Sequence, residues 1–238
     1  MGGGNEEELQ RMLPQPKIAP SMLASDFANL ASEAKFMEQC GADWLHMDMV
    51  HSYFCRMFLV TNPLDYVGEL VKAGASGFTF HVEVAQVLKR KPMTADAVWV
   101  EMAPTDNWRE LVRRIKAGGM RAAVALKPGT PVEVVFPLVE SAQPVDMVLV
   151  MTVEPRFAGQ KFMPDMMTKV NTLRKKFPHL DIQVDGGLGP STIQQAATAG
   201  ANCIVAGSSV FGAQDPAGVI SDLRNGVEGA QASLSFFK

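Results

Sequence analysis

The feature that most constrains the fold of this chain is a unit that recurs along it: an amphipathic stretch, a glycine and a short apolar run. The unit reads QCGADWLHMD, KAGASGFTFHVE, KAGGMRAAVAL and TAGANCIVAGSS. We expect Gly41, Gly74, Gly118 and Gly200 to lie just past helices, where glycine adopts a left-handed conformation at little cost. The apolar runs that follow are apolar on both faces, as strands of a parallel sheet covered by helices are.

Strands and helices alternate along the whole chain. Strands are predicted near residues 18, 46, 79, 124, 149, 183 and 204, and amphipathic helices over 27–40, 64–73, 106–117, 131–141, 164–177, 191–199 and 216–225. This alternation predicts an α/β fold, a (β/α)8 TIM barrel of parallel strands, with a doubly wound open sheet as the alternative. An eighth strand is expected either at CRMFLV (55–60) or at AVWVE (97–101).

Composition limits the functional classes. The 238 residues carry a net charge of −3, which argues against a nucleic-acid or membrane partner. The start MGGGNEEELQ lacks a basic, apolar leader, so residues 1–15 are predicted to be a disordered lead-in and residues 16–238 a single domain. Cys40, Cys55 and Cys203 are odd in number and lack CxxC spacing, which predicts reduced thiols and a cytoplasmic location.

The predicted strand ends carry polar side chains. In barrels the active site lies at the carboxyl ends of the strands. His46 and Asp48 are two residues apart and therefore share one face of an extended strand. With Asp185 at the end of another strand, imidazole and carboxylates indicate a site for Zn, Fe, Mn or Co. The alternative is a partly buried histidine that is hydrogen-bonded to its neighbour.

Two glycine-rich turns follow the last two strands, VDGGLGPST (184–192) and VAGSSVFG (205–212). Glycine leaves backbone N–H groups open to phosphate oxygens, and barrels often bind phosphate at this place. We therefore predict a phosphate site there, with ordinary turns as the alternative. Two carboxylates beside a metal suit proton transfer next to a carbonyl, as in an epimerase of phosphorylated ketoses. The residues alone leave isomerase, aldolase and decarboxylase open.

Several motifs together resemble the ribulose-phosphate 3-epimerase family, most closely its cytosolic plant forms. They are IAPSMLASDFANL (18–30), GADWLHMD (41–48), VTNPLDYV (60–67), AGASGFTFHVEV (73–84), LVMTVEP (149–155), GQKFMPDMM (159–167) and DIQVDGGLGPSTI (181–193). The resemblance covers residues 17 to about 230. It implies a TIM barrel, interconversion of D-ribulose 5-phosphate and D-xylulose 5-phosphate in the pentose phosphate pathway, one divalent metal ion (Zn, Fe(II), Mn or Co) and a homo-oligomer.

The resemblance also implies roles for individual residues. His46, Asp48 and Asp185 are expected to be metal ligands, and Asp48 and Asp185 also the two catalytic acid/bases, which act through a metal-stabilised enediolate. The expected substrate-binding residues are Ser21, Met151, Gly159, Gly186, Gly187, Gly207 and Ser208.

The chain departs from the family pattern in three places. After Asp48 the family continues into a long loop, a helix and a third strand with a second metal histidine; here roughly twenty residues are missing, and that histidine aligns with Met57. Residues 85–104 look like an insertion, and the phosphate loop reads RFAG (156–159) where the family has Gly-Phe-Gly-Gly. We expect CRMFLV (55–60) to take the place of the third strand.

These departures leave three interpretations open. The chain is an active epimerase with an altered metal site, or a non-catalytic or impaired relative, such as an isoform or gene-model variant, that still binds sugar phosphate. A sister barrel such as a hexulose-phosphate synthase or orotidine-phosphate decarboxylase is disfavoured, because those carry an Asp-x-Lys-x-x-Asp run at His46-Met47-Asp48. His51 and His81 are weak candidates to replace the missing histidine, and His179 is expected on a surface loop.

Overall fold

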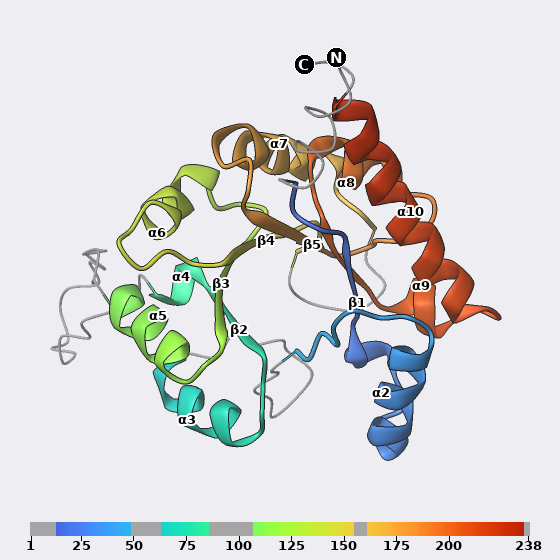
Figure 1. Ribbon diagram of the computed structural model, residues 1–238, viewed down its shortest axis with the longest axis horizontal. Coiled ribbons are helices and arrows are strands. Elements are labelled where there is room, and N and C mark those ends of the chain that lie inside the picture. The colour runs from blue at the N-terminus through green and yellow to red at the C-terminus, as the bar shows by residue number, and fades with distance from the viewer. Residues whose placement is uncertain (1–12, 49–62, 86–106, 155–160, 236–238) are drawn as a thin grey trace, which may run out of the picture.

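The computed structural model describes residues 13–48, 63–85, 107–154 and 161–235, and these contain one curved sheet of six parallel strands (Figure 1). The order across the sheet is β1-β6-β5-β4-β3-β2, and every neighbouring pair is parallel. The strands are β1 (Lys17–Pro20), β2 (Gly77–His81), β3 (Arg121–Leu126), β4 (Met147–Met151), β5 (Asp181–Asp185) and β6 (Cys203–Ala206). This arrangement confirms the predicted TIM-barrel class of parallel strands.

The strand predicted near residue 46 is present as a single parallel bridge between Ser21 and His46. The His46 amide donates to the Pro20 carbonyl at 2.9 Å, and the Met22 amide donates to the His46 carbonyl at 2.9 Å. Residue 46 therefore continues the sheet beyond β1. The candidates for the remaining strand, 55–60 and 97–101, lie outside the described residues, so their assignment stays a prediction, as do the roles of His51 and Met57.

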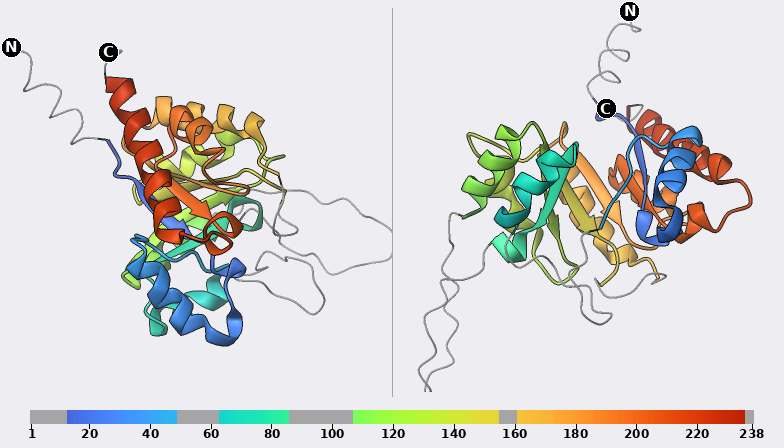
Figure 2. Two further views of the ribbon diagram at one scale, coloured as in Figure 1. Left: turned by 90° about the vertical axis from the view of Figure 1, so that its right-hand side faces the viewer. Right: turned by 90° about the horizontal axis from the view of Figure 1, so that it is seen from below.

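Helices surround the outer face of the sheet (Figures 1 and 2). They are α2 (Leu30–Gln39), α3 (Leu64–Lys72), α4 (Val82–Ala85), α5 (Asn107–Ala117), α6 (Phe136–Val139), α7 (Met167–Lys176), α8 (Ile193–Ala199), α9 (Ser208–Phe211) and α10 (Pro216–Ser235), with short 3-10 turns at Met22–Ala24, Phe27–Asn29, Val132–Val135 and Pro164–Met166. The helix predicted over 216–225 is thus longer than expected. None of the helices in the described ranges is long and apolar enough to cross a membrane.

The strands bury both of their faces, but against different partners. Val124, Val148, Ile182 and Ile204 point outward into the large core beneath the helices. The inner residues form small clusters inside the barrel: Ala123, Met147 and Cys203 with Trp44, and then Ala125, Leu149 and Met151. Layered inner side chains are typical of a filled barrel, so the polar residues at the strand ends lie above a packed interior.

Three of the four predicted left-handed glycines are confirmed. Gly41, Gly74 and Gly200 have φ of 92°, 76° and 109°. The prediction was wrong for Gly118, because the left-handed residue is Gly119, with φ of 79°. Gly118 is required for a different reason: a Cβ there would collide with the Val71 side chain of α3, so the glycine permits close packing of α3 on α5.

The predicted lead-in, residues 1–15, lies mostly outside the described residues, and its boundary with the domain stays a prediction. The carbonyl of Pro14 accepts from Gln231 Nε2 at 2.8 Å, and the carbonyl of Gln15 accepts from Asn202 Nδ2 at 3.0 Å. These bonds attach the start of the described chain to α10 and to the residue before β6.

Candidate metal centre

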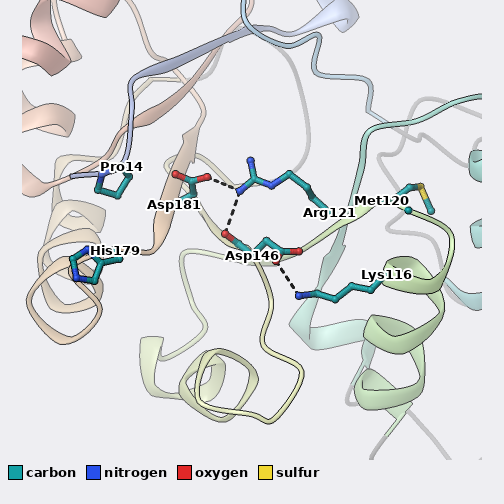
Figure 3. A pocket seen from close by; sticks show the side chains of 8 residues that line it. Pro14, Lys116, Met120, Arg121, Asp146, His179 and Asp181 are labelled. Carbon is teal, nitrogen blue, oxygen red and sulfur yellow. Dashed lines mark hydrogen bonds and ion pairs between the residues drawn. The ribbon is translucent and has the colours of Figure 1, made fainter. Parts of the chain in front are cut away.

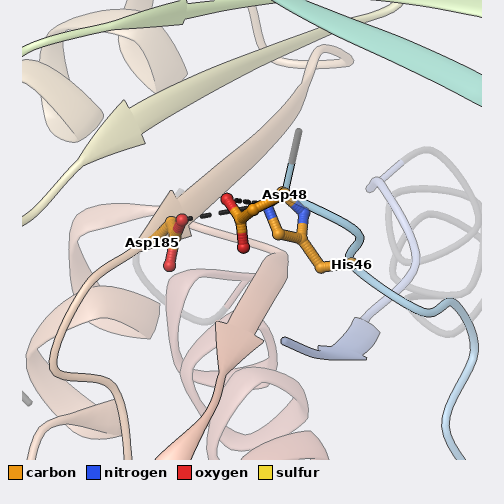
Figure 4. Close-up of side chains that lie close together, drawn as sticks. All are labelled: His46, Asp48 and Asp185. Atoms are coloured by element: carbon orange, nitrogen blue, oxygen red, sulfur yellow. Dashed lines mark ion pairs between the residues drawn. The ribbon is translucent and has the colours of Figure 1, made fainter. Parts of the chain in front are cut away.

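His46, Asp48 and Asp185 come together at the carboxyl ends of the strands (Figure 4). His46 Nε2 lies 3.4 Å from Asp48 Oδ1 and 3.9 Å from Asp185 Oδ2. One ligand atom from each of the three residues lies within 4.8 Å of the others. The structure thus brings together the three residues that the sequence predicts as metal ligands.

The backbone explains this placement. Asp185 is the last residue of β5, and its carbonyl accepts from the Thr152 amide at 2.7 Å, which fixes the strand end. The buried Ser21 follows β1, and its hydroxyl donates to Asp48 Oδ2 at 3.1 Å. Ser21, predicted as a substrate residue, therefore also orients one of the carboxylates.

The donor set fits a divalent ion. Two ligands about 2.1 Å from one ion at a tetrahedral angle are about 3.4 Å apart. The separations of 3.4 and 3.9 Å between the histidine nitrogen and the two carboxylate oxygens are close to that spacing. Within the described ranges, the group contains these three side chains, and His81 is not a member of it.

The two carboxylates have pKa values moved in opposite directions. The pKa of Asp185 is raised to about 6: burial is the largest cause, the nearby Asp48 charge adds to the rise, and His46 and His81 oppose it. Burial also acts to raise the pKa of Asp48, but hydrogen bonds from His46 and Ser21 and the charge of His46 outweigh it and lower this pKa. Carboxyl groups with separated pKa values are typical of an acid/base pair.

His46 responds to the same two carboxylates. Burial alone would lower the pKa of His46, but the hydrogen bond to Asp48 and the negative charge of Asp185 raise it above its ordinary value. In the metal-free protein the imidazole and the carboxylates therefore stabilise one another's charged forms.

The predicted phosphate-binding residues lie beside this group. Gly186 and Gly187 follow β5 with φ of 122° and 68°, and a Cβ on Gly186 would lie 2.5 Å from a Val153 methyl carbon. Gly207 and Ser208 follow β6, and a Cβ on Gly207 would lie 3.6 Å from Ser21 Cβ. Gly207 thus lies next to Ser21 at the β1 end of the site, and Gly186 packs against Val153.

The other predicted positions vary in outcome. Met151 is buried inside the barrel with Ala125 and Leu149. Gly159 and the rest of the phosphate loop lie outside the described residues. His179 is exposed in the turn between α7 and β5, as predicted. His81 is hydrogen-bonded to Glu83, at 3.2 Å between Nδ1 and Oε2.

Sequence reasoning did not find the support around Glu83. Its carboxylate accepts from the Lys127 amide at 2.9 Å and from the Thr130 hydroxyl. Lys169 Nζ donates to the carbonyls of the same turn, at 2.6 Å for Pro128 and Thr130. The only sequence signal for this turn is the run KPGT (127–130) after β3, which predicts a turn but no partners.

A pocket of about 500 Å³ lies at the opposite end of the barrel (Figure 3). Arg121 and Asp181, the first residues of β3 and β5, line it and form an ion pair, and Lys116 pairs with Asp146 at 2.9 Å. Arg121 also lies over the Trp44 ring, 5.1 Å from its centroid. The amino ends of barrel strands usually serve stability, and these paired charges lie far from the metal centre.

Comparison with known proteins identifies relatives along nearly the whole chain. Ribulose-phosphate 3-epimerase, cytoplasmic isoform, of Oryza sativa subsp. japonica is 58% identical over 238 residues, covering 90% of this chain and 96% of the relative. Ribulose-phosphate 3-epimerase of Candida glabrata is 44% identical, covering 90% and 93%.

Solved structures support the fold alone, because their sequences are distant. A 3-hexulose-6-phosphate synthase from Salmonella typhimurium superposes with a TM-score of 0.56 at 17% identity, covering 90% of this chain and 99% of that one. Mycobacterium tuberculosis tryptophan synthase gives 0.58 at 14% identity, covering 94% and 97%. A family model described as "Ribulose-phosphate 3 epimerase family" matches residues 17–211 of this chain. The chain therefore belongs to the ribulose-phosphate 3-epimerase family.

Proposed function

We propose that this chain is an isomerase that interconverts D-ribulose 5-phosphate and D-xylulose 5-phosphate by moving a proton at C3. The observation that carries the proposal is the pair of carboxylates within reach of His46: Asp48, two residues past the bridge at His46, and Asp185 at the end of β5. An epimerisation needs one group to take a proton from one face of the carbon and another to deliver a proton to the opposite face. Family membership supports the same reaction.

His46, Asp48 and Asp185 are the residues proposed to hold one Zn, Fe(II), Mn or Co ion. When bound, this ion would supply positive charge beside the sugar oxygens. Asp48 and Asp185 exchange protons with C3, and their separated pKa values suit opposite roles in the two directions of the reaction. The Ser21 hydroxyl, 3.1 Å from Asp48 Oδ2, keeps that carboxylate oriented while it gains and loses a proton.

The phosphate group of the substrate is proposed to lie over the ends of β5 and β6. Gly186, Gly187 and Gly207 add no side chain of their own beside their backbone N–H groups, and Ser208 adds a hydroxyl. Gly159 and Met151 complete the proposed substrate contacts by family resemblance.

We further propose a cytoplasmic location and a homo-oligomer. The name of the rice relative supports the location, and the exposed apolar side chains of Phe27 and Met47 would suit an interface.

A second candidate is an impaired relative that binds sugar phosphate without turning it over. It is favoured by the number of metal ligands, since the group in the described residues has three side chains where the family pattern has a further histidine. A three-residue site still leaves coordination positions for water or substrate, as catalytic metal sites do. We therefore place the active enzyme first.

The test is a coupled assay of D-ribulose 5-phosphate epimerisation, with Zn, Fe(II), Mn or Co added to the purified protein. We expect turnover, and we expect Asp48→Asn and Asp185→Asn each to reduce it by at least about a hundredfold, as loss of a general acid or base does. Asp222→Asn, on the exposed side of α10, makes the same chemical change away from the site and should leave the rate unchanged. A folded protein without turnover in any of the metals would favour the impaired relative.

A further inference from the structure

His81 faces the inside of the barrel at the same end as the metal centre. It is the last residue of β2, where Phe78 and Phe80 point outward into the core beneath the helices. His81 therefore points to the opposite face. In the sheet it pairs with Ala125, an inner residue that packs on Leu149 and Met151. The imidazole thus stands at the inner edge of the site, above the packed interior.

A rigid carboxylate fixes the orientation of this ring. Glu83 holds His81 Nδ1 at 3.2 Å, and the same carboxylate accepts from Lys127 and Thr130 of the turn after β3. Although burial alone would raise it, these hydrogen bonds lower the pKa of Glu83 to about 2, so the carboxylate is ionised. An ionised acceptor keeps the proton of neutral imidazole on Nδ1 and leaves a lone pair on Nε2. In the part of the chain that the structure describes, Nε2 has no hydrogen-bond partner.

The ring is near the metal centre but separate from it. When His81 is protonated, its charge lowers the pKa values of both Asp48 and Asp185, so the ring lies within electrostatic reach of the two carboxylates. It nevertheless lies outside the group of three ligand residues. The imidazole and the two carboxylates therefore lie at the same end of the barrel without forming one ligand group.

The sheet order indicates which part of the proposed substrate comes nearest to His81. The proposed phosphate residues follow β5 and β6, whereas β2 lies at the other edge of the sheet, beyond β4 and β3. A ketose 5-phosphate that places its phosphate at β5 and β6 and its C3 at the two carboxylates directs C1 toward β2. The group nearest His81 is then the hydroxyl on C1.

We propose that His81 is a further substrate-contacting residue, whose Nε2 accepts a hydrogen bond from the C1 hydroxyl of the ketose, and that Glu83 is its positioning residue. The inference rests on the proposed epimerase function and adds a specificity: His81 distinguishes a ketose with a terminal CH2OH group from one that ends in a methyl group. A site built to hydrogen-bond a hydroxyl rejects the analogue that lacks it.

The experiment compares D-xylulose 5-phosphate with its 1-deoxy analogue, which keeps the carbonyl and the C3 proton but lacks the C1 hydroxyl. Uptake of deuterium at C3 from D2O, followed by NMR, gives kcat/KM for both compounds with the metal-loaded protein. We expect the unmodified chain to prefer the hydroxylated compound by roughly tenfold or more, the effect of one such hydrogen bond.

Two substitutions of His81 form a matched pair. In His81→Asn the amide nitrogen stands near the position of Nδ1, so the bond to Glu83 is kept and the Nε2 position is empty. In His81→Gln the longer amide reaches the Nε2 position. We expect the preference to vanish in His81→Asn and to persist in His81→Gln. Glu83→Gln should raise KM for the hydroxylated compound and leave KM for the 1-deoxy compound unchanged.

Each other outcome overturns the inference in a recognisable way. A preference that persists in His81→Asn means that another residue binds the C1 hydroxyl. A loss of bound Co(II) from His81→Asn on dialysis, where the unmodified chain retains it, means that His81 is a metal ligand. Absence of deuterium uptake from both compounds by the unmodified chain overturns the proposed function and this inference together. Circular dichroism of each variant checks that it is folded.

Discussion

The substitution Asp185→Asn is expected to stabilise the metal-free protein while it abolishes epimerisation. Burial and the neighbouring Asp48 raise the pKa of the Asp185 carboxyl from 3.8 to about 6. Between these two values the folded protein holds a proton that the unfolded chain has released. The free energy of unfolding therefore falls as the pH rises from 3.8 to 6. Above pH 6 the full cost of burying the ionised Asp185 carboxylate is present.

The size of the effect follows from the shift. About two pKa units at about 1.4 kcal/mol each correspond to roughly 3 kcal/mol. Asparagine has no charge to bury, so Asp185→Asn should gain up to about 3 kcal/mol at pH 7 and nothing below pH 4. For a chain of this size, that gain raises Tm by about 6–12 °C.

The assay is urea unfolding of EDTA-treated protein between pH 4 and pH 8. Asp48→Asn is the matched control, because the pKa of Asp48 is lowered and its ionised form stabilises the fold. It should therefore destabilise the protein at pH 7, the opposite of Asp185→Asn. The reasoning would be refuted if Asp185→Asn changed stability equally at pH 4 and pH 8, or if the two variants shifted it in the same direction.

Two further predictions compare matched positions. Glu83 and Glu110 both have pKa values lowered to about 2, but Glu83 is largely buried and Glu110 is exposed. Glu83→Gln should destabilise by about 3 kcal/mol at pH 7, with the difference disappearing as the pH falls from 4.5 to 2, whereas Glu110→Gln should have little effect because solvent screens its ion pairs. Equal effects in urea unfolding would contradict this. Gly186 has a φ of 122°, and an added methyl group would meet Val153, so Gly186→Ala should destabilise the protein by about 3 kcal/mol. Gly229 lies inside α10 with open space around it, so Gly229→Ala should stabilise by about 0.5–1 kcal/mol. Thermal unfolding of both variants tests this, and an unchanged stability of Gly186→Ala would contradict it.

Much of the fold could be predicted because each unit repeats the same local signals. Each of these signals spans about ten residues: the apolar runs, the amphipathic stretches and the glycines after helices. The six strands β1 to β6 lie where the apolar runs predict them. Gly118 shows the limit of such reasoning: two glycines in succession both fit a helix end, and only packing against Val71 separates them. The length of α10 was also missed, since its Gly226 and Gly229 are weak helix formers and only tertiary packing keeps that stretch helical.

One part of the candidate site could likewise be predicted from the sequence, and another part could not. His46, Asp48 and Asp185 could be predicted because they sit at strand ends, whose position in a barrel is fixed by topology. The contacts of Glu83 with the turn at Thr130 could not, because they join residues 47 apart, one in α4 and one in the turn after β3. Such pairings depend on the register of β2 and β3, which no local pattern specifies.

The part of the barrel that carries the metal centre is held by bonds among described residues. Asp43 Oδ2 accepts from the Ile18 amide at 2.8 Å and from Arg224 Nη1 at 2.9 Å, which attaches the start of the segment that ends at Asp48 to β1 and to α10. β1 pairs with β6, and β6 with β5, which delivers Asp185. Each ligand is thus positioned by bonds among residues 17–48, 147–152 and 181–224. These bonds bring Asp48 and Asp185 to His46, and for this reason we expect proton transfer at C3 to survive the loss of the family's further histidine.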